Sequence, residues 1–362
     1  MKMKKILFCA LAALLTLSAC SEKKTVPLYG WQSVRANPDL AADREEWTGW
    51  KSHGMTGVCV NARLEDVPAL AALAHELGLE YHAWKPCMLE GGKPNDWYAV
   101  NRLGQGADEH PAYVDYYKAM DPSHPAVQEY LVEEMKAYAA IPDVDYVQLD
   151  YIRYPDAVLA RGLWDKYGLD FSDGPLPAAD YCYCDRCVEL FRARTGIDIR
   201  EAEDPEAVPE WTAFRCSLVT ELVTKVCDAV HAAGKKVSAD VFPGPESYAV
   251  GMVRQQWNEW PVDMLFPMNY NDFYLEPAEW LETVTAEEVK AAGDVPVISG
   301  LFICRDWRRK AEIEDPEGHG LLPSEIATAV QGSLKAGAAG ICLYTPDSMT
   351  GEHWAELDRL IL

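Results

Sequence analysis

Hydrophobic and polar positions along the chain fall into two alternating patterns. Short, mostly apolar runs of six to nine residues are separated by longer stretches in which apolar residues recur every three or four positions. The short runs are typical of buried strands, and the longer stretches are typical of amphipathic helices. The expected strands cover residues 29–34, 56–62, 80–86, 145–152, 235–242, 262–270, 296–303 and 339–345. The expected helices between them include residues 37–54, 65–78, 124–140, 211–234 and 324–337.

The order of these elements predicts the fold class. Strands that alternate with helices pair in parallel, and eight such units are typical of a (β/α)8 TIM barrel in the α/β class. Long polar segments follow the third and fourth expected strands. We therefore expect a single barrel over residues 27–362 with enlarged loops at these two places. An open doubly wound sheet is the alternative, and it is disfavoured because no glycine-rich phosphate loop follows the first strand.

The N-terminal segment predicts export and a lipid anchor. A basic start precedes a short apolar run at residues 6–19, which is too short for a comfortable membrane span. The run ends in Leu-Ser-Ala-Cys, which resembles the lipobox of bacterial lipoproteins and implies lipidation of Cys20. We therefore expect a signal peptide at residues 1–19, a lipidated tether at 20–26, and a location in the bacterial cell envelope, periplasmic or at the cell surface. An ordinary secretory signal with a chance cysteine is the alternative.

Composition narrows the classes of partner. The 362 residues include 57 acidic and 33 basic side chains, which give a formal net charge of −24. Phosphate binding needs a basic face, so this charge argues against a nucleic-acid partner. The chain also offers no polybasic patch for anionic lipid, so we expect membrane attachment only through the N-terminal lipid.

The ends of two neighbouring expected strands carry carboxylates. Active sites of TIM barrels lie at the C-terminal ends of the strands, and Asp150 and Asp240 close the fourth and fifth. Adjacent strands lie about 4.8 Å apart, so both side chains can reach one mouth, as glycoside hydrolysis requires. We predict Asp150 as nucleophile or general base and Asp240 as its acid partner. The alternatives are a structural ion pair of Asp150 with Arg153 and a turn-capping role for Asp240.

The aromatic composition favours a carbohydrate ligand. The chain has 12 Trp and 18 Tyr against 8 Phe. Trp and Tyr rings combine an apolar face with a polar edge, and sugars have the same split character. Packing is the alternative role for most of these rings. The expected substrate-binding residues are His82, Trp84, Tyr151, Arg153, Tyr154, Asn269, Tyr270 and Tyr344.

Four segments, in order, carry a family resemblance. They are VQLDYIRYP at 147–155, YCYCDRCVELFRARTG at 181–196, KKVSADVFPGPE at 235–246 and VRQQWNEWPVDMLFPMNYNDFY at 253–274. The chain resembles the glycoside hydrolase-like proteins of the family-10-like barrel group over about residues 29–354. The resemblance implies a (β/α)8 barrel and a carbohydrate substrate.

A looser likeness to the alpha-amylase superfamily bears on the roles of the acids. It implies that Asp150 is the nucleophile and that an acid of the fifth strand donates the proton. The chain departs from that pattern at two places. Gln148 stands where the superfamily has an arginine, and Asp240 stands where it has a glutamate. The alternative proton donors are Glu246, Asp156 and Asp306.

Cys182, Cys184 and Cys187 lie close together in the segment after the fourth expected strand. Three thiols at this spacing could bind zinc, but the sequence offers no clear fourth ligand. Exported proteins usually oxidise such thiols. We therefore expect a disulfide or a packed thiol cluster, with no metal and no organic cofactor.

Two other functions stay open. A glycan-binding lipoprotein without turnover would keep the aromatic mouth but lack a correctly spaced acid pair. A lyase acting on uronic-acid glycans would need a basic cluster for the substrate carboxylate. The candidates for that cluster are Lys85, Arg102, Arg153 and Arg305.

Overall fold

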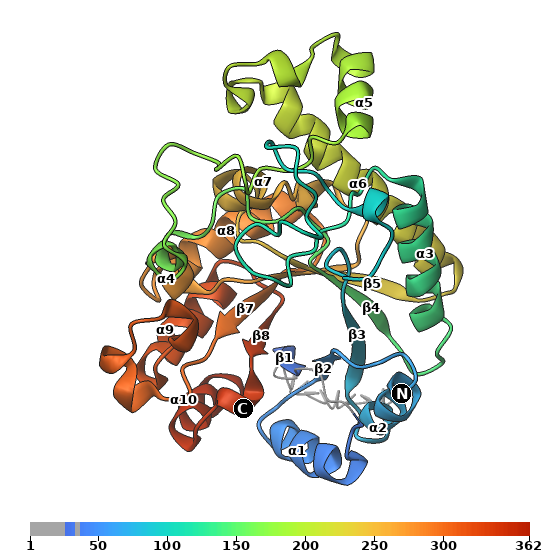
Figure 1. Cartoon of the computed structure of the whole chain (residues 1–362). Helices are drawn as coiled ribbons and strands as arrows, with labels where there is room; N and C mark the ends of the chain where they lie inside the picture. The colour runs from blue at the N-terminus through green and yellow to red at the C-terminus, as the bar shows by residue number, and fades with distance from the viewer. Residues whose placement is uncertain (1–25, 33–36) are drawn as a thin grey trace, which may run out of the picture.

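Eight parallel strands form a ring in the computed structural model, which describes residues 26–32 and 37–362 (Figure 1). The strands are β1 (Leu28–Gln32), β2 (Gly57–Val60), β3 (Glu80–Pro86), β4 (Tyr146–Asp150), β5 (Lys236–Val241), β6 (Met264–Pro267), β7 (Ile298–Phe302) and β8 (Gly340–Tyr344). Each strand from β1 to β5 pairs with the next, and β8 pairs with both β7 and β1. Parallel bridges from Leu265 to Val297 and from Met268 to Gly300 close the ring between β6 and β7. The predicted TIM barrel is confirmed.

Helices surround the strands in Figure 1. They are α1 (Leu40–Ser52), α2 (Val67–Glu76), α3 (Pro125–Ala139), α4 (Trp164–Tyr167), α5 (Asp185–Thr195), α6 (Pro209–Ala232), α7 (Val250–Val253), α8 (Trp280–Ala292), α9 (Pro323–Lys335) and α10 (Gly351–Ile361). All the strands and helices expected between residues 37 and 362 are present, most with slightly shorter ends. The last two positions of the first expected strand, 33 and 34, lie outside the described residues.

Two layers of side chains make up the core. Side chains alternate between the two faces of a strand, so every strand sends some residues into the barrel and some toward the helices. Inside the barrel, rings from several strands fill the lumen, and Tyr29 and Trp31 both make edge contacts with Phe266. Outside, aliphatic residues of the strands pack against the helices, as Val147 and Leu149 do. The filled lumen forms a solid floor beneath the C-terminal ends of the strands.

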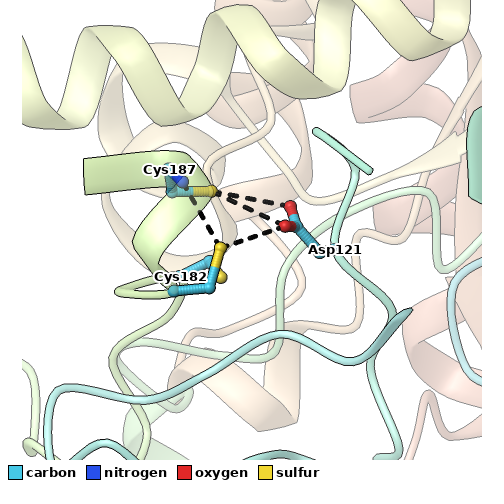
Figure 2. A group of neighbouring side chains, drawn as sticks. Asp121, Cys182 and Cys187 are labelled. Atoms are coloured by element: carbon cyan, nitrogen blue, oxygen red, sulfur yellow. Dashed lines mark hydrogen bonds between the residues drawn. The ribbon is translucent and has the colours of Figure 1, made fainter. Parts of the chain in front are cut away.

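The two enlarged loops contact each other, and a group of cysteines lies at one of these contacts. The first insert (residues 87–124) follows β3, and the second insert (residues 151–208) follows β4. Asp121 of the first insert contacts Cys184 and Cys187 of the second, and Cys182 adjoins them (Figure 2). The nine cysteines within the described residues are all free. Of the two arrangements that we expected for these three cysteines, a disulfide or packed thiols, the structure has the packed thiols.

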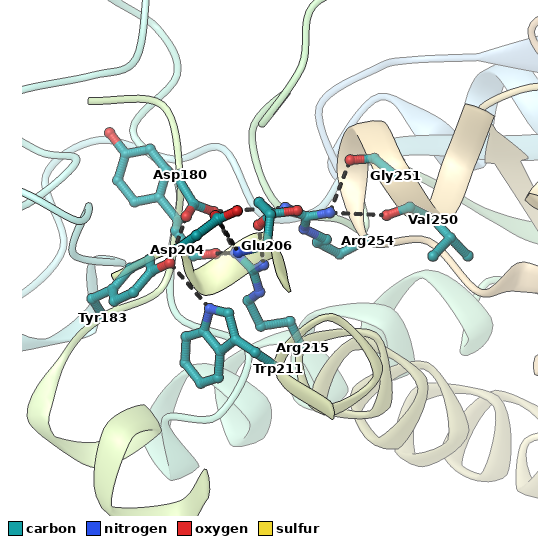
Figure 3. A network of polar contacts seen from close by, with 10 residues as sticks. Asp180, Tyr183, Asp204, Glu206, Trp211, Arg215, Val250, Gly251 and Arg254 are labelled. Atoms are coloured by element: carbon teal, nitrogen blue, oxygen red, sulfur yellow. Dashed lines mark hydrogen bonds and ion pairs between the residues drawn. The ribbon is translucent and has the colours of Figure 1, made fainter. Parts of the chain in front are cut away.

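A buried ion-pair network fastens the second insert to the helices (Figure 3). Arg215 of α6 pairs with Asp180 and, at 2.9 Å, with Glu206, both from the second insert. Arg254, which ends α7, donates to the same Glu206 carboxylate at 2.8 Å. The guanidinium groups of both arginines are shielded from solvent. Because a buried charge is costly without its partner, this network holds the insert in one position.

Within residues 26–32 and 37–362, no helix has both the length and the apolar character needed to cross a bilayer. The expected signal peptide, the Cys20 lipidation site and nearly all of the expected tether lie outside the described residues.

Candidate active site

A cavity of ≈ 520 Å³ opens at the C-terminal ends of the barrel strands, and we refer to it as the mouth cavity. This is the end of a TIM barrel where parallel strands present their last side chains together. Six strands contribute to its wall through Trp31 of β1, Trp84 of β3, Asp150 of β4, Asp240 of β5, Phe302 of β7 and Tyr344 of β8. Both inserts add further residues, so the two enlarged loops deepen the cavity above the strands.

Asp150 lies at the last position of β4 and is almost completely buried. The indole N–H of Trp84 donates to its Oδ2 at 3.0 Å, and the backbone N–H of Tyr151 donates to its Oδ1 at 2.6 Å. Burial raises the pKa of this carboxyl to about 6, against the lowering effects of the Tyr151 N–H, the Arg153 guanidinium and the Trp84 indole. Asp150 is therefore ionised at neutral pH.

Asp240 lies on β5 and is equally buried, but its surroundings differ. Gln148 and Trp31 both donate to its Oδ1, at 2.6 and 3.3 Å, while its buried Oδ2 has no hydrogen-bond partner within the part of the chain that the structure describes. Burial raises the pKa of Asp240 well above its usual range, and the nearby Asp150 raises it further. These effects favour the protonated form of Asp240, and Oδ2, which has no hydrogen-bond partner among the described residues, is the atom available to carry the proton.

The two carboxyl groups come from neighbouring strands in matching register. Leu149 of β4 pairs with Ala239 of β5, so the next residue on each strand is one of the two aspartates. Strands so paired lie about 4.8 Å apart. Both aspartates line the mouth cavity, as we predicted from the ends of the two strands.

Aromatic rings build much of the cavity wall. Tyr270 and Tyr344 stack with their ring centres 5.3 Å apart, and Trp31 meets Tyr344 edge-on. On the side formed by the inserts, Tyr117 of the first insert meets Tyr151 of the second at 5.9 Å. Flat rings around a small cavity suit a ligand with apolar faces and polar edges.

Arg153 is the cation of the cavity wall, and it is firmly held. Its guanidinium pairs with Asp156 at 3.2 Å and donates to the Tyr117 hydroxyl, also at 3.2 Å. It also lies over the rings of Tyr151 and Phe242, at 4.9 and 4.7 Å. These contacts neutralise the charge and fix the loop that follows Asp150.

The structure brings seven of the ten predicted catalytic and binding residues to the mouth cavity. They are Asp150, Asp240, Trp84, Tyr151, Arg153, Tyr270 and Tyr344.

Three expected sugar contacts need correction. His82 is fully buried in the lumen, stacked on Tyr146 with its Nδ1 3.0 Å from the Ser238 hydroxyl, one layer below Trp84. The buried Asn269 donates to Glu288 at 3.0 Å and to a serine of β7 at 3.1 Å. The buried Tyr154 lies beside the cysteines of the second insert, and its pKa is raised by burial and by Cys187. None of the three lines the cavity.

The positions of the three alternative proton donors make each of them less suitable than Asp240. Asp156 lines the cavity but is held by Arg153 and Tyr113. Glu246 and Asp306 are exposed and lie outside the cavity wall. Asp240 therefore remains the carboxyl group best placed beside Asp150.

Sequence reasoning missed several cavity residues that loops supply. Glu317 reaches the wall from the loop after β7, where it pairs with Lys166 and accepts from the Tyr167 hydroxyl at 3.2 Å. No pattern in the sequence points to Glu317. Tyr113, Tyr116 and Tyr117 come from the first insert, and their dense tyrosine spacing was an available signal.

Comparisons with known proteins agree with this geometry. The model of the family described as Glycosyl hydrolase-like 10 matches residues 64–292. A search of the curated proteins found no match.

Solved structures with the same barrel include two carbohydrate enzymes. The glycoside hydrolase domain of PgaB (BpsB) from Bordetella bronchiseptica superposes with a TM-score of 0.60 at 14% identity, covering 92% of this chain and 99% of that one. The catalytic domain of beta-amylase from Paenibacillus polymyxa gives 0.58 at 10% identity, covering 92% and 97%. At these identities the likeness shows the barrel fold.

Proposed function

Because the chain belongs to the glycosyl hydrolase-like 10 family, we propose that it hydrolyses a glycosidic bond in an oligosaccharide or polysaccharide. One observation carries the proposal. Two neighbouring carboxyl groups share the mouth cavity, and their surroundings act on them in opposite directions: Arg153 favours the ionised form of Asp150, and the charge of Asp150 favours the protonated form of Asp240. A glycosidase needs this combination of one acid and one carboxylate.

The environments of the two groups assign their roles. Asp240, protonated and with a free Oδ2, donates its proton to the glycosidic oxygen as the bond breaks. Asp150, ionised and held by Trp84 and Tyr151, attacks the anomeric carbon or takes a proton from an attacking water. Fixed hydrogen bonds to both Asp150 oxygens keep the carboxylate in place and reduce the reorganisation needed during the reaction.

The charges of the cavity wall favour a substrate without carboxylates. Among residues 26–32 and 37–362, the ionisable side chains of the wall other than tyrosine are the acids Asp150, Asp156, Asp240 and Glu317 and the cation Arg153. Of the other cations considered for a uronic-acid lyase, Lys85 pairs with Glu134 at 2.9 Å, and Arg102 and Arg305 do not line the cavity. A glycosidase acting on an uncharged glycan therefore fits better than a lyase.

A screen of the purified protein on a panel of glycans tests the proposal by release of reducing ends. Asp150→Asn and Asp240→Asn are each expected to lower turnover by about 10²–10⁴-fold, the usual contribution of a positioned acid or base. Asp306→Asn is the matched control, because Asp306 is exposed and lies outside the cavity wall.

Two results would contradict the proposal. Full turnover by Asp150→Asn would show that Asp150 and Asp240 are not the catalytic pair. Glycan binding by the unaltered protein without cleavage across the panel would favour the binding-only alternative.

We also propose that the domain is lipid-anchored in the bacterial cell envelope through Cys20. The apolar run and the Leu-Ser-Ala-Cys motif support this. The full chain should partition into the detergent phase, and Cys20→Ser should move to the aqueous phase; equal partitioning of the two would exclude the anchor.

A further inference from the structure

Three thiols and one carboxylate converge where the two inserts meet, and we call these four side chains the Cys3Asp cluster (Figure 2). It consists of Asp121, Cys182, Cys184 and Cys187, and its ligand atoms all lie within 4.8 Å of one another. The Cys184 sulfur lies 3.2 Å from Asp121 Oδ2, and the Cys187 sulfur lies 3.6 Å from Oδ1. Asp121 is the fourth ligand that the sequence did not reveal.

These separations match the shell of a tetrahedral metal ion. Zinc binds thiolate sulfur at about 2.3 Å and carboxylate oxygen at about 2.0 Å, which places sulfur and oxygen ligands ~3.5 Å apart. Measured to one oxygen, Asp121 Oδ2, the sulfurs of Cys184 and Cys187 lie at 3.2 and 3.8 Å, on either side of that value. A zinc ion therefore requires only small movements of side chains that are already in place.

We propose that Asp121, Cys182, Cys184 and Cys187 hold a structural zinc ion that fastens the first insert to the second. Thiolates select zinc over hard cations such as magnesium, and zinc favours four ligands in a tetrahedron. All four positions are filled by protein, which leaves none for a substrate or a reactive water. On binding, the thiols release their protons to solvent, and no redox change occurs.

Neighbouring groups already orient the ligands. Ser123 donates its backbone N–H to Asp121 Oδ1 at 2.8 Å and its hydroxyl to Oδ2 at 2.9 Å. The Cys184 sulfur accepts the Cys187 N–H at 3.4 Å, and the Cys182 sulfur accepts the Val100 N–H at 3.3 Å. Metal ligands are commonly fixed by such outer hydrogen bonds, and N–H donors stabilise sulfur in its thiolate form.

The charge balance of the cluster points to a cation. Asp121, Cys182 and Cys187 are buried, and no lysine or arginine within the described residues forms an ion pair with Asp121. Buried carboxylates are normally paired with a cation or bound to a metal. Cys184 and Cys187 also lie at the N-terminal end of α5, where the helix dipole favours negative charge.

An ion can reach the cluster from solvent. Asp121 and the half-buried Cys184 line a second cavity, of ≈ 740 Å³, on the outer side of the inserts. This cavity shares no lining residue with the mouth cavity. The metal site is therefore separate from the proposed reaction, and its test does not depend on glycan cleavage.

The test measures metal bound to the full chain, purified without chelator from zinc-supplemented cells. We expect about one zinc ion per chain by elemental analysis, and intense sulfur-to-cobalt absorption in the near ultraviolet after cobalt replacement. Cys184→Ser and Asp121→Asn should weaken zinc binding by more than the ~10–100-fold typical of losing an outer-shell partner. Cys227→Ser is the matched control, because Cys227 is a free, buried cysteine of α6 outside the cluster.

A measurement on the unaltered chain guards against variants that fail to fold. Adding a strong chelator should raise the number of thiols that react with a colorimetric reagent by three and should lower the melting temperature. Absence of bound zinc or cobalt in the unaltered chain would overturn the proposal. A mass two hydrogens lower, with a disulfide mapped between two of the three cysteines, would also overturn it.

Discussion

At the scale of single residues, the reactivity of the site depends on how two aspartates are surrounded. Both are buried, yet Asp150 accepts hydrogen bonds at both oxygens, while Asp240 has one oxygen without a partner. Each accepts two hydrogen bonds, but the Arg153 guanidinium lowers the pKa of Asp150, whereas the charge of Asp150 raises the pKa of Asp240. A difference of a few contacts is therefore enough to make one residue the base and the other the acid.

The pH dependence of glycan cleavage follows from these two groups. Asp150 must be ionised, so activity should fall as the pH drops below about 6. Asp240 must be protonated, so activity should also fall at the alkaline end of a bell-shaped profile. Trp84→Phe removes a donor to ionised Asp150, which raises the Asp150 pKa and should move the acid limb upward by about one pH unit. If the acid limb of the pH profile lies at the same pH in Trp84→Phe as in the unaltered protein, the Trp84 hydrogen bond does not influence the pKa of Asp150.

The stability of the protein should respond to Asp240 in the direction opposite to activity. The folded-state pKa of Asp240 is raised well above its unfolded value of about 3.9, so above that pH the folded protein holds a proton on this side chain more tightly than the unfolded chain does. Folding must then take up a proton, which costs free energy at neutral pH. Asp240→Asn avoids this cost and should raise the melting temperature at pH 7.

The titration of Asp240 also determines the pH range in which Asp240→Asn is the more stable protein. Below about pH 4, Asp240 is protonated in both states, so the advantage of Asp240→Asn should disappear. Thermal unfolding of the variant and the unaltered chain at pH 7 and pH 3.5 checks this. An equal difference at both pH values would mean that titration of Asp240 is not responsible.

The sequence predicted which residues lie near the C-terminal ends of the strands and therefore at the cavity. It did not predict how far down the barrel a given side chain lies. Asp150 is the last residue of β4, Asp240 is the last but one of β5, and both reach the mouth cavity. His82 and Trp84 both point into the lumen because they are two positions apart, but only Trp84 is near enough to the end of β3 to line the cavity. The alternation of side chains along a strand shows whether a residue points into the barrel or toward the helices. It does not show at which height of the barrel that residue lies.

At the scale of elements, the strands were predictable and the interior of the inserts was not. The eight apolar runs are short, buried on both faces and separated by helical stretches, so their pattern is unambiguous. The inserts have few regular elements and are held by specific polar contacts, such as the network around Arg215. Those contacts join residues far apart in the chain, and no local periodicity reveals them.

The Arg215 network should contribute strongly to stability. Arg215→Met leaves Asp180 and Glu206 with one cation fewer in a buried site, and breaking a buried pair in this way typically costs about 3–5 kcal/mol. Urea unfolding measures the loss. Arg194→Met is the control, because Arg194 pairs with Glu221 on an exposed surface, and such pairs contribute roughly 0–1 kcal/mol. Equal losses in the two variants would contradict a special role for the buried network.

At the scale of the whole molecule, the net charge of the chain and the charges of the cavity wall both oppose the binding of anions. The chain carries a formal net charge of −24, and the described part of the mouth-cavity wall has four acids and one guanidinium, which is already paired with Asp156. Both the overall field and the local one repel anions, so the molecule should discriminate against acidic glycans before and after they enter the cavity.

This repulsion predicts a salt-dependent preference among substrates. An uncharged oligosaccharide should bind at least about tenfold more tightly than its uronic-acid counterpart, a difference of ~1.4 kcal/mol. Calorimetric titration at low and high ionic strength measures the ratio, which should shrink with salt because screening weakens long-range repulsion. Tighter binding of the acidic glycan would contradict the charge argument.

The reacting aspartates are carried by strands, whereas Tyr113, Tyr116 and Tyr117 are carried by an insert that joins the barrel from outside. Changes in length or sequence of that insert would reshape what the cavity accepts while leaving the chemistry beneath it untouched. Such an architecture lets selection diversify ligand preference by loop exchange, and it gives protein engineers a graftable segment for retargeting the scaffold.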